Sequence, residues 1–391
     1  MRLVVLDEIP EDDGLRRQWN ALALQMQRPQ VFYTYDWSLA VQRAYRQTLH
    51  PLIFLAHDDR SHDNKNSLIG IAALATDGKA HASFLCATTG DYCDFLSSTE
   101  HRPAFIAAVL ADLRRRNVEK VTLTNLPADS PTVSALQRDA AESGYRSFAR
   151  TAYICTQVAL DRLERRPADN KPVLPGKKMV RRSLAAMGKE SPVRLEHARS
   201  WDEISPILPQ FVEAHIARFE ATGRVSNLAQ PERRRFLEEL TKQLSPYGWV
   251  VLTRMMSGDR VLAWNYGFVF EGVWFWYQPT FDSALEKYSP GFCLLSKLVE
   301  DAAENPELRA VDLGLGAEEY KDRFANQTRE TLYVTLRASA VQHVREIVRY
   351  RAAEIVKASP RVEAAARALL KRVRRPPKSP SQNAMPGKES I

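Results

Sequence analysis

The residues best suited to binding an anion lie around the tripeptide Ser289-Pro290-Gly291. An apolar run at helical spacing follows the tripeptide, Pro290 suits the first helical turn, and Ser289 suits the cap position. Free backbone N–H groups and the helix dipole attract anions there, and glycine permits close approach. We therefore expect a pyrophosphate or a carboxylate at this turn, with an ordinary capped helix packed on a sheet as the alternative. The candidate binding residues are Lys287, Tyr288, Ser289, Gly291 and Phe292.

Strands on both sides must position this turn. An alternating aromatic run, with Val273, Phe275 and Tyr277 on one face, indicates a strand before it. A short apolar strand at 310–313 comes after the helix and closes on a turn that contains Gly314 and Gly316. A short helix with charged and phenolic side chains, 318–321, follows that turn. Strand, small-residue turn, helix and strand is a common way to build a phosphate site.

The same order of elements occurs twice in the chain, although residue identity between the two copies is very low. Each copy has a Trp-bearing helix, a hairpin, an apolar helix and a short strand. The matching ranges are 51–76 and 249–270 for the hairpins, 102–116 and 290–303 for the helices, and 121–125 and 310–313 for the short strands. The pattern predicts internal duplication and an α/β or α+β fold with mixed sheets.

Length and composition agree with two domains. The chain has 391 residues, of which 45% are hydrophobic, and a domain averages ~100–200 residues. We expect a first domain at 1–160, a charged, proline-bearing linker at 161–176 and a second domain at 177–337. No apolar run reaches the ~18 residues of a membrane span, and the N-terminus lacks the pattern of a signal peptide. The 4 cysteines show no metal-binding spacing, so we expect thiols in a reducing cytoplasm and no metal.

The positive charge is concentrated at the C-terminal end. Residues 337–391 carry 13 Lys and Arg against 4 Asp and Glu, although the whole chain has a net charge of +8. Apolar spacing at Val341, Val344, Val348 and Ile355 predicts a helix within a basic helical extension, 338–375, and 376–391 has a disordered composition. A basic extension suits an anionic partner such as a membrane surface, but it could also aid solubility. The apolar face of the predicted helix could lie on a membrane. It could also pack on the body of the protein, and we favour this second interpretation.

The second half resembles the BioF2-like (CelD-like) acyltransferase domain of the GNAT superfamily. The resemblance covers roughly 177–336 and rests on Phe211 with His215, Gly248-Trp249, Ala263–Gly267, Ser289-Pro290-Gly291, Asp312–Gly316, and Tyr320-Lys321 with Phe324. The first half resembles the same domain as a degenerate copy. A tandem GNAT pair is also similar to the Fem family of peptidyltransferases, which use aminoacyl-tRNA. The resemblance therefore implies tandem GNAT-like domains followed by basic helices.

The resemblance implies transfer of an acyl group to an amine. GNAT enzymes bind the pyrophosphate of acyl-CoA at the start of the helix after the fourth strand, which is 290–303 here. This sequence departs from the family at that turn, because the usual Arg/Gln-x-x-Gly-x-Gly/Ala pattern reads Lys287-Tyr-Ser-Pro-Gly-Phe. One glycine remains and Pro290 removes an amide donor. Acyl-CoA is the expected co-substrate, and a donor on a carrier protein or on tRNA stays open.

An N-acyl transfer needs a base for the attacking ammonium, donors for the oxyanion and an acid for the leaving group. Tyr320 is the candidate acid, or it packs on the sheet edge. Lys321 could stabilise negative charge or hold a phosphate, or it is a surface lysine. Glu318 and Glu319 are candidate bases, of which only one can face a site because neighbouring helical residues point ~100° apart.

Further candidates lie elsewhere in both halves. Asp312 at a strand end is a candidate base or a turn residue. His215 suits a base near neutral pH, although a lone helical histidine is more often structural. The segment Asp91–Asp94 reads as a turn that leads into a strand and borders the acceptor cleft.

We therefore expect a cytoplasmic N-acyltransferase that acts on an amino sugar or similar amine in polysaccharide or cell-envelope biosynthesis. It could also lie at the inner face of the membrane. We do not expect sequence-specific nucleic-acid binding. The alternatives are a non-catalytic accessory protein of a biosynthetic complex, and a Fem-like transferase that uses aminoacyl-tRNA.

Overall fold

A computed structural model describes residues 1–58, 67–78, 80–316 and 318–358. The chain divides into two compact units, Met1–Ser339 and Ala340–Ile391. The first unit holds both predicted halves, and the second holds the C-terminal extension.

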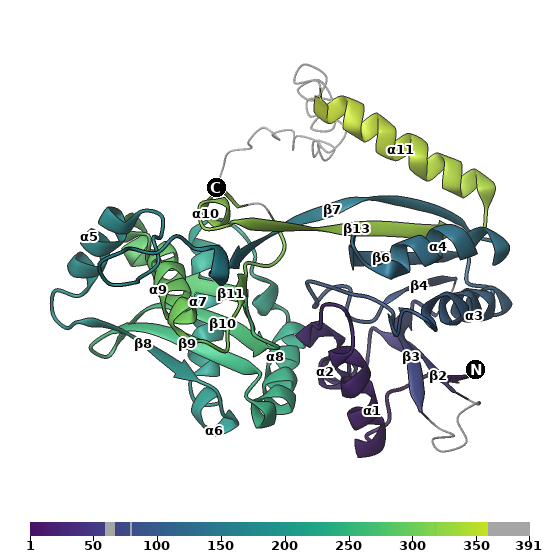
Figure 1. Ribbon diagram of the computed structural model, residues 1–391, viewed down its shortest axis with the longest axis horizontal. Helices are drawn as coiled ribbons and strands as arrows, with labels where there is room; N and C mark the ends of the chain where they lie inside the picture. The colour runs from purple at the N-terminus through teal and green to yellow at the C-terminus, as the bar shows by residue number, and fades with distance from the viewer. Residues whose placement is uncertain (59–66, 79, 317, 359–391) are drawn as a thin grey trace, which may run out of the picture. The chain divides into compact units, whose positions relative to one another are not determined.

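The first half combines α-helices with strands that are mostly antiparallel (Figure 1). Its elements are β1 (Arg2–Leu6), α1 (Asp13–Leu24), α2 (Tyr35–Tyr45), β2 (His50–His57), β3 (Leu68–Thr76), β4 (His81–Phe84), β5 (Leu96–Ser97), α3 (Arg102–Arg115), β6 (Lys120–Pro127), α4 (Pro131–Glu142) and β7 (Arg146–Ala159).

The second half repeats this order after a linker. Its elements are α5 (Lys177–Met187), β8 (Val193–Ala198), α6 (Trp201–Ile204), α7 (Leu208–Ala221), α8 (Pro231–Leu244), β9 (Val250–Ser257), β10 (Arg260–Phe270), β11 (Val273–Phe281), α9 (Pro290–Glu304), β12 (Ala310–Asp312), α10 (Glu319–Asp322) and β13 (Gln327–Arg337). The predicted mixed α/β class is confirmed. A capping box begins α6, because the Ser200 hydroxyl accepts from the backbone N–H of Glu203 and the Glu203 carboxylate accepts from that of Ser200.

Within the described ranges, the two halves share one 13-stranded sheet in the order β1-β2-β3-β4-β6-β13-β7-β12-β11-β10-β9-β8, with β5 beside β3. Long antiparallel strands β7 and β13 lie side by side where the halves meet (Figure 1). Each half inserts a strand into the other, because β13 pairs with β6 and β7 pairs with β12. The backbone ladder is therefore continuous from one half to the other.

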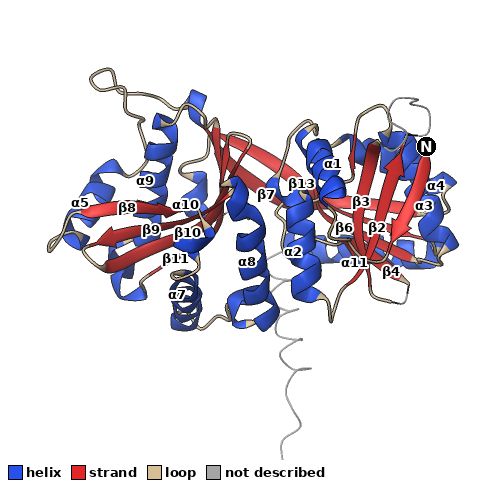
Figure 2. Cartoon of the chain, turned by 90° about the horizontal axis from the view of Figure 1, so that it is seen from below, coloured by secondary structure: helices blue, strands red, loops and turns tan. Residues whose placement is uncertain are grey.

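Helices also join the halves. Helix α2 of the first half packs against α8 of the second (Figure 2). The rings of Trp37 and Phe236 meet edge to face with centroids 5.5 Å apart, and Arg43 reaches Glu239 at 3.1 Å. Aromatic pairs of this kind stabilise the folded state by ~0.5–1.5 kcal/mol beyond the contribution of the surface that they bury.

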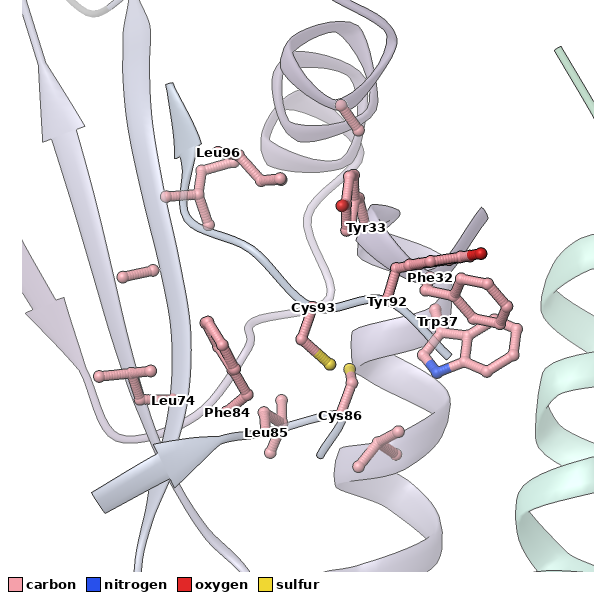
Figure 3. Close-up of a cluster of buried hydrophobic side chains, with 14 of the residues drawn as sticks. Phe32, Tyr33, Trp37, Leu74, Phe84, Leu85, Cys86, Tyr92, Cys93 and Leu96 are labelled. Atoms are coloured by element: carbon pink, nitrogen blue, oxygen red, sulfur yellow. The ribbon is translucent and has the colours of Figure 1, made fainter. Parts of the chain in front are cut away.

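A buried cluster in the first half fixes the loop that leads to β5 (Figure 3). The phenyl ring of Phe32 lies against the indole of Trp37, with centroids 4.7 Å apart, and the Trp37 indole N–H donates to Thr89 Oγ1 at 3.1 Å. Tyr92 and Cys93 are almost fully buried in the same cluster. Residues 89–93 are therefore held in one conformation.

Helix α11 (Ala340–Ala358) forms the described part of the second unit. Its apolar stripe consists of Val341, Val344, Val348 and Ile355, whose side chains are exposed. No helix among the described residues is long and apolar enough to cross a membrane. The rest of the predicted basic helical extension, 359–375, and the predicted disordered segment 376–391 lie outside the described residues.

Candidate functional site: two cavities at a gap in the sheet

The sheet of the second half opens between β11 and β12. These parallel strands pair only from Val273 with Ala310 to Phe275 with Asp312. Strand β12 ends there, but β11 continues to Phe281. The remainder of β11 therefore has a partner on one side only, and the sheet has a gap at the end of β12.

A bulge beside this gap directs side chains of β11 to both faces of the sheet. The register between β10 and β11 shifts between Tyr266 and Phe268, at Gly267. A Cβ added at Gly267 would lie 2.5 Å from the carbonyl oxygen of Phe275, so only glycine fits. Trp276 and Pro279 border a cavity on the α9 side, whereas Tyr277 and Gln278 border a cavity on the opposite side.

The cavity on the first side, which we call the α9 cavity, has a volume of about 340 Å³. It is within the ~300–1,000 Å³ range of small-molecule sites. It brings together the start of α9, the gap in the sheet and helix α10. Its lining residues are Met179, Arg218, Trp276, Pro279, Phe281, Glu286, Ser289, Gly291, Phe292, Tyr320 and Arg323.

The first turn of α9 offers backbone donors to this cavity. The predicted serine cap is wrong in detail: Ser289 occupies the cap position with φ of 51°, but its side chain makes no capping hydrogen bond. Pro290 has no N–H, and the amides of Gly291 and Phe292 lie where an α-helix provides no acceptor. Two amides therefore stand at the positive end of the helix dipole, and the guanidinium groups of Arg218 and Arg323 line the same cavity.

Tyr320 lies at the edge of the α9 cavity. Its hydroxyl accepts a hydrogen bond from the Trp276 indole N–H at 3.3 Å. Burial and the nearby Glu318 carboxylate raise the Tyr320 pKa to about 12. The phenol consequently stays protonated at neutral pH and can donate a hydrogen bond from its O–H.

The structure brings four of the ten predicted site residues together in this cavity, namely Ser289, Gly291, Phe292 and Tyr320. Lys287 and Tyr288 directly precede the helix, and the Lys287 ammonium lies 4.9 Å from the Tyr288 ring centre. They do not line the cavity themselves.

The other four predicted residues lie outside both cavities. Glu319 is exposed on α10. Lys321 is buried, donates to the Leu315 carbonyl at 3.0 Å and pairs with Glu318 at 2.6 Å. Lys321 is therefore not a surface lysine.

His215 and Asp312 have structural partners. The His215 ring is buried, shares a 2.8 Å hydrogen bond with Ser226 and stacks on Phe219. Burial and nearby arginines lower the His215 pKa to about 4, so this ring is neutral at physiological pH. The buried Asp312 carboxylate accepts from Tyr92 at 2.8 Å, from Gln157 at 2.6 Å and from the Gly314 amide at 2.8 Å.

The cavity on the opposite side of the sheet, which we call the inter-half cavity, has a volume of about 630 Å³. Both halves build it, and polar groups dominate its lining. Its lining residues are Ala87, Thr88, Thr89, Gly90, Asp91, Thr124, Asn125, Arg150, Ala152, Tyr153, Asn227, Arg233, Tyr277, Gln278, Leu315 and Tyr333. The segment at Asp91 was predicted to border the acceptor cleft, and the structure places Asp91 in the lining of this cavity.

Arg233 is a site residue that sequence reasoning missed. Its side chain is buried and donates to the Thr88 carbonyl at 3.2 Å and to the Tyr277 hydroxyl at 2.7 Å. It thereby ties α8 of the second half to the loop of the first. Nothing local in the sequence separates it from the neighbouring arginines of α8, because its partners lie far along the chain.

A scan of family models matches residues 176–322 to the GNAT acetyltransferase domain. No curated protein matches the chain significantly. Among solved structures, FemX is similar with a TM-score of 0.56 and 9% identity, covering 85% of this chain and 97% of FemX. The C-terminal domain of an assigned lysylphosphatidylglycerol synthetase from Agrobacterium fabrum is similar with a TM-score of 0.51 and 11% identity, covering 86% of this chain and 94% of that domain. L-PGS from Bacillus licheniformis is similar with a TM-score of 0.50 and 12% identity, covering 80% of this chain and 95% of the L-PGS chain.

The family match falls on the half that contains the sheet gap, the start of α9 and Tyr320. The structural matches extend over both halves, and at these identities they show the fold alone. Residues 176–322 therefore match the GNAT acetyltransferase domain, and the chain shares its two-half fold with FemX.

Proposed function

We propose that this protein is an N-acyltransferase that takes an acyl group from a donor in the α9 cavity and passes it to an amine in the inter-half cavity. The observation that carries the proposal is that two cavities lie on opposite faces of one sheet and are lined by adjacent residues of the β11 bulge. Donor and acceptor could then meet at the gap in the sheet without sharing an entrance.

Acyl-CoA is the donor that the α9 cavity fits best. Its pyrophosphate would accept from the amides of Gly291 and Phe292, where the helix dipole favours negative charge. Arg218 and Arg323 would supply the remaining positive charge. The pantetheine arm would then lead along Trp276 toward the gap.

Transfer joins the amine nitrogen to the acyl carbon and breaks the carbon–sulfur bond. The attacking nitrogen loses a proton to a base, and Tyr320 donates its phenolic proton to the leaving thiolate. The residue of β11 left outside the ladder at the bulge offers a backbone N–H to the oxyanion. The Trp276 indole, which donates to the Tyr320 hydroxyl at 3.3 Å, would position the phenol.

The lining of the inter-half cavity suits a polyhydroxylated amine such as an amino sugar. Threonine, asparagine and glutamine side chains provide donors and acceptors, and Tyr153, Tyr277 and Tyr333 provide aromatic surfaces for a sugar ring. We therefore propose a role in polysaccharide or cell-envelope biosynthesis.

An aminoacyl-tRNA donor is a second candidate. Only one glycine stands at the turn and Pro290 removes a donor, so the site offers fewer amides than a glycine-rich phosphate turn. The fold shared with FemX also favours an aminoacyl-tRNA donor. In this case an aminoacyl ester, and not a thioester, would be cleaved at the same gap.

The test is turnover by the purified full chain with glucosamine as the amine and either acetyl-CoA or aminoacyl-tRNA as the donor. Release of free thiol that depends on glucosamine supports the thioester reaction, and release of deacylated tRNA supports the second candidate. If neither donor binds or reacts, the transferase proposal is wrong and a non-catalytic accessory role remains.

A further inference from the structure

One carboxylate of the first half reaches the gap in the sheet of the second. Asp91 follows Gly90, whose carbonyl accepts from the Asn125 amide at 2.9 Å. It precedes Tyr92, whose buried hydroxyl donates to Asp312 at 2.8 Å. The chain is thus anchored on both sides of Asp91, and its carboxylate is placed by buried neighbours.

The position of this carboxylate follows from what surrounds Gly314, just past the end of β12. A Cβ added at Gly314 would lie 2.8 Å from Asp91 Oδ2 and 3.6 Å from the Trp276 carbonyl oxygen. Trp276 lines the α9 cavity, whereas Asp91 lines the inter-half cavity. The carboxylate therefore stands where the two cavities approach each other.

The surroundings of Asp91 favour its protonated form. No hydrogen bond or ion pair to this carboxylate comes from the described part of the chain. Burial and the neighbouring Asp312 carboxylate raise the Asp91 pKa to about 7, although Lys321 and Arg233 oppose the shift. A base with a pKa near the working pH is the most effective for proton transfer.

We propose that Asp91 is the base that accepts a proton from the acceptor ammonium, so that the first half completes the active site of the second. This inference deepens the proposed function and rests on it. A proton moves from the ammonium to Asp91 Oδ, and the freed lone pair forms the bond to the acyl carbon. The carbon–sulfur bond then breaks, and the thiolate takes the proton of Tyr320.

The kinetic test compares the wild type with Asp91→Asn, Asp91→Glu and the control Asp202→Asn, which removes an exposed carboxylate on α6. With acetyl-CoA and glucosamine, we expect the wild-type kcat/KM to rise with pH through about 7. Asp91→Asn should lower kcat by ~10²–10⁴-fold and remove this pH limb, with acetyl-CoA binding unchanged. Asp91→Glu should restore part of the rate, and Asp202→Asn should match the wild type. An active Asp91→Asn with the wild-type pH profile would overturn the inference and leave the proposed function standing.

A second readout needs no substrate. The folded-state pKa of Asp91, about 7, exceeds its ordinary value of 3.8, so the folded protein loses stability as pH rises between these values. Asparagine cannot ionise and avoids this loss. The melting temperature of Asp91→Asn should therefore exceed that of the wild type by more at pH 8 than at pH 5. If no amine is turned over, the same offset at both pH values would by itself overturn the placement of Asp91.

A different observation carries a second inference, which concerns α11. Val341, Val344, Val348 and Ile355 are 62%, 56%, 59% and 68% exposed. Spacings of three, four and seven residues place them on one stripe of a helix. The helix has 19 residues, which gives it a length of about 28 Å.

Positive charge accompanies this stripe. Arg345 lies one turn after Val341, and Arg351 lies two turns after Val344. In helical projection they therefore stand on opposite sides of the apolar stripe. Both arginines are exposed. In sequence, residues 359–391 add 8 Lys and Arg against 2 Asp and Glu. An apolar stripe between arginines, next to a basic segment, complements a surface that is apolar beneath and negatively charged at its headgroups.

We infer that α11 binds an anionic lipid surface, with its valine stripe among the acyl chains and its arginines at the headgroups. The full chain should sediment with vesicles of phosphatidylcholine and phosphatidylglycerol, and less so in high salt, which screens the headgroup attraction. Val348→Asp should weaken binding by at least ~10-fold because a buried valine is worth ~1.5–3 kcal/mol. Ala353→Asp, which adds the same charge away from the stripe, should change binding far less.

Equal loss of binding in both variants would mean that charge alone holds the chain on the vesicle. Failure to bind anionic vesicles, or concentration-dependent self-association abolished by Val348→Asp, would overturn the lipid assignment. None of these outcomes depends on the acyl-transfer reaction.

Discussion

Gly291→Glu should abolish saturable binding of acetyl-CoA. The residue lies in the first turn of α9, where its amide and that of Phe292 face the proposed pyrophosphate site. A glutamate there places a carboxylate within a few ångströms of the phosphates, and its side chain occupies part of the α9 cavity. We expect affinity to fall by at least ~100-fold, since like charges at short range near a protein surface cost several kcal/mol. Isothermal titration of the full chain with acetyl-CoA measures this.

Gly291→Ala is the matched control. A Cβ at this position would lie 3.2 Å from Cδ1 of the Phe281 ring, a tight contact that a small movement of the ring relieves. The alanine variant should therefore keep affinity within ~10-fold of the wild type, because one displaced contact costs about 1 kcal/mol. Equal binding by the glutamate variant and the wild type would show that CoA does not use the start of α9.

Arg102→Met should destabilise the folded protein by ~3–5 kcal/mol, because removing one partner of a buried pair leaves an uncompensated charge. Arg102 is 4% exposed. Its guanidinium donates to the Phe95 carbonyl at 2.7 Å and to Thr132 Oγ1 at 2.7 Å, donates to the Ser97 carbonyl, and lies 3.7 Å from the Asp94 carboxylate. Methionine fills much of the volume and satisfies none of these acceptors. Urea unfolding followed by circular dichroism gives the change in the free energy of unfolding.

Arg115→Met provides the comparison on the same helix. The Arg115 side chain is 74% exposed and pairs with Asp112 at 2.7 Å. Because Arg115 is exposed and Asp112 keeps its pair with Arg116, the loss should stay within the ~0–1 kcal/mol of a surface pair, and this variant should unfold close to the wild type. A loss below ~1 kcal/mol for Arg102→Met would mean that the polar cluster around Asp94 does not stabilise the first half as described.

Much of the second half could be predicted because its signals are local. The apolar spacing after Pro290 predicted α9, and the alternating aromatics at Val273–Tyr277 predicted β11. The grouping of Gly291 with Tyr320 also followed from the order of strand, helix, strand and helix, and both residues line one cavity.

The remaining features arise from contacts between distant parts of the chain. The interleaving of β7 and β13 pairs residues such as Arg146 and Arg337, and no local pattern encodes that choice. Asp91 reaches the gap beside Gly314 only after both halves have folded, so its burial and raised pKa were invisible in sequence. His215 looked suited to acid–base chemistry by residue type, but its environment keeps it neutral and bonded to Ser226.

Ser289 shows a limit of motif reasoning at the level of one residue. A serine before a proline at a helix start suits a side-chain cap, yet here the backbone enters the helix through the left-handed region with φ of 51°. In that conformation the hydroxyl makes no capping bond, and the first-turn amides stay available. The first-turn amides are thus available because the predicted serine cap does not form.

The most direct test is a crystal structure of the full chain with coenzyme A. We expect pyrophosphate oxygens about 3 Å from the amide nitrogens of Gly291 and Phe292 and the pantetheine sulfur near the Tyr320 hydroxyl, on the α9 side of the gap. Coenzyme A bound elsewhere, or an α9 cavity left empty at saturating coenzyme A, would contradict the assignment of this cavity to the acyl donor.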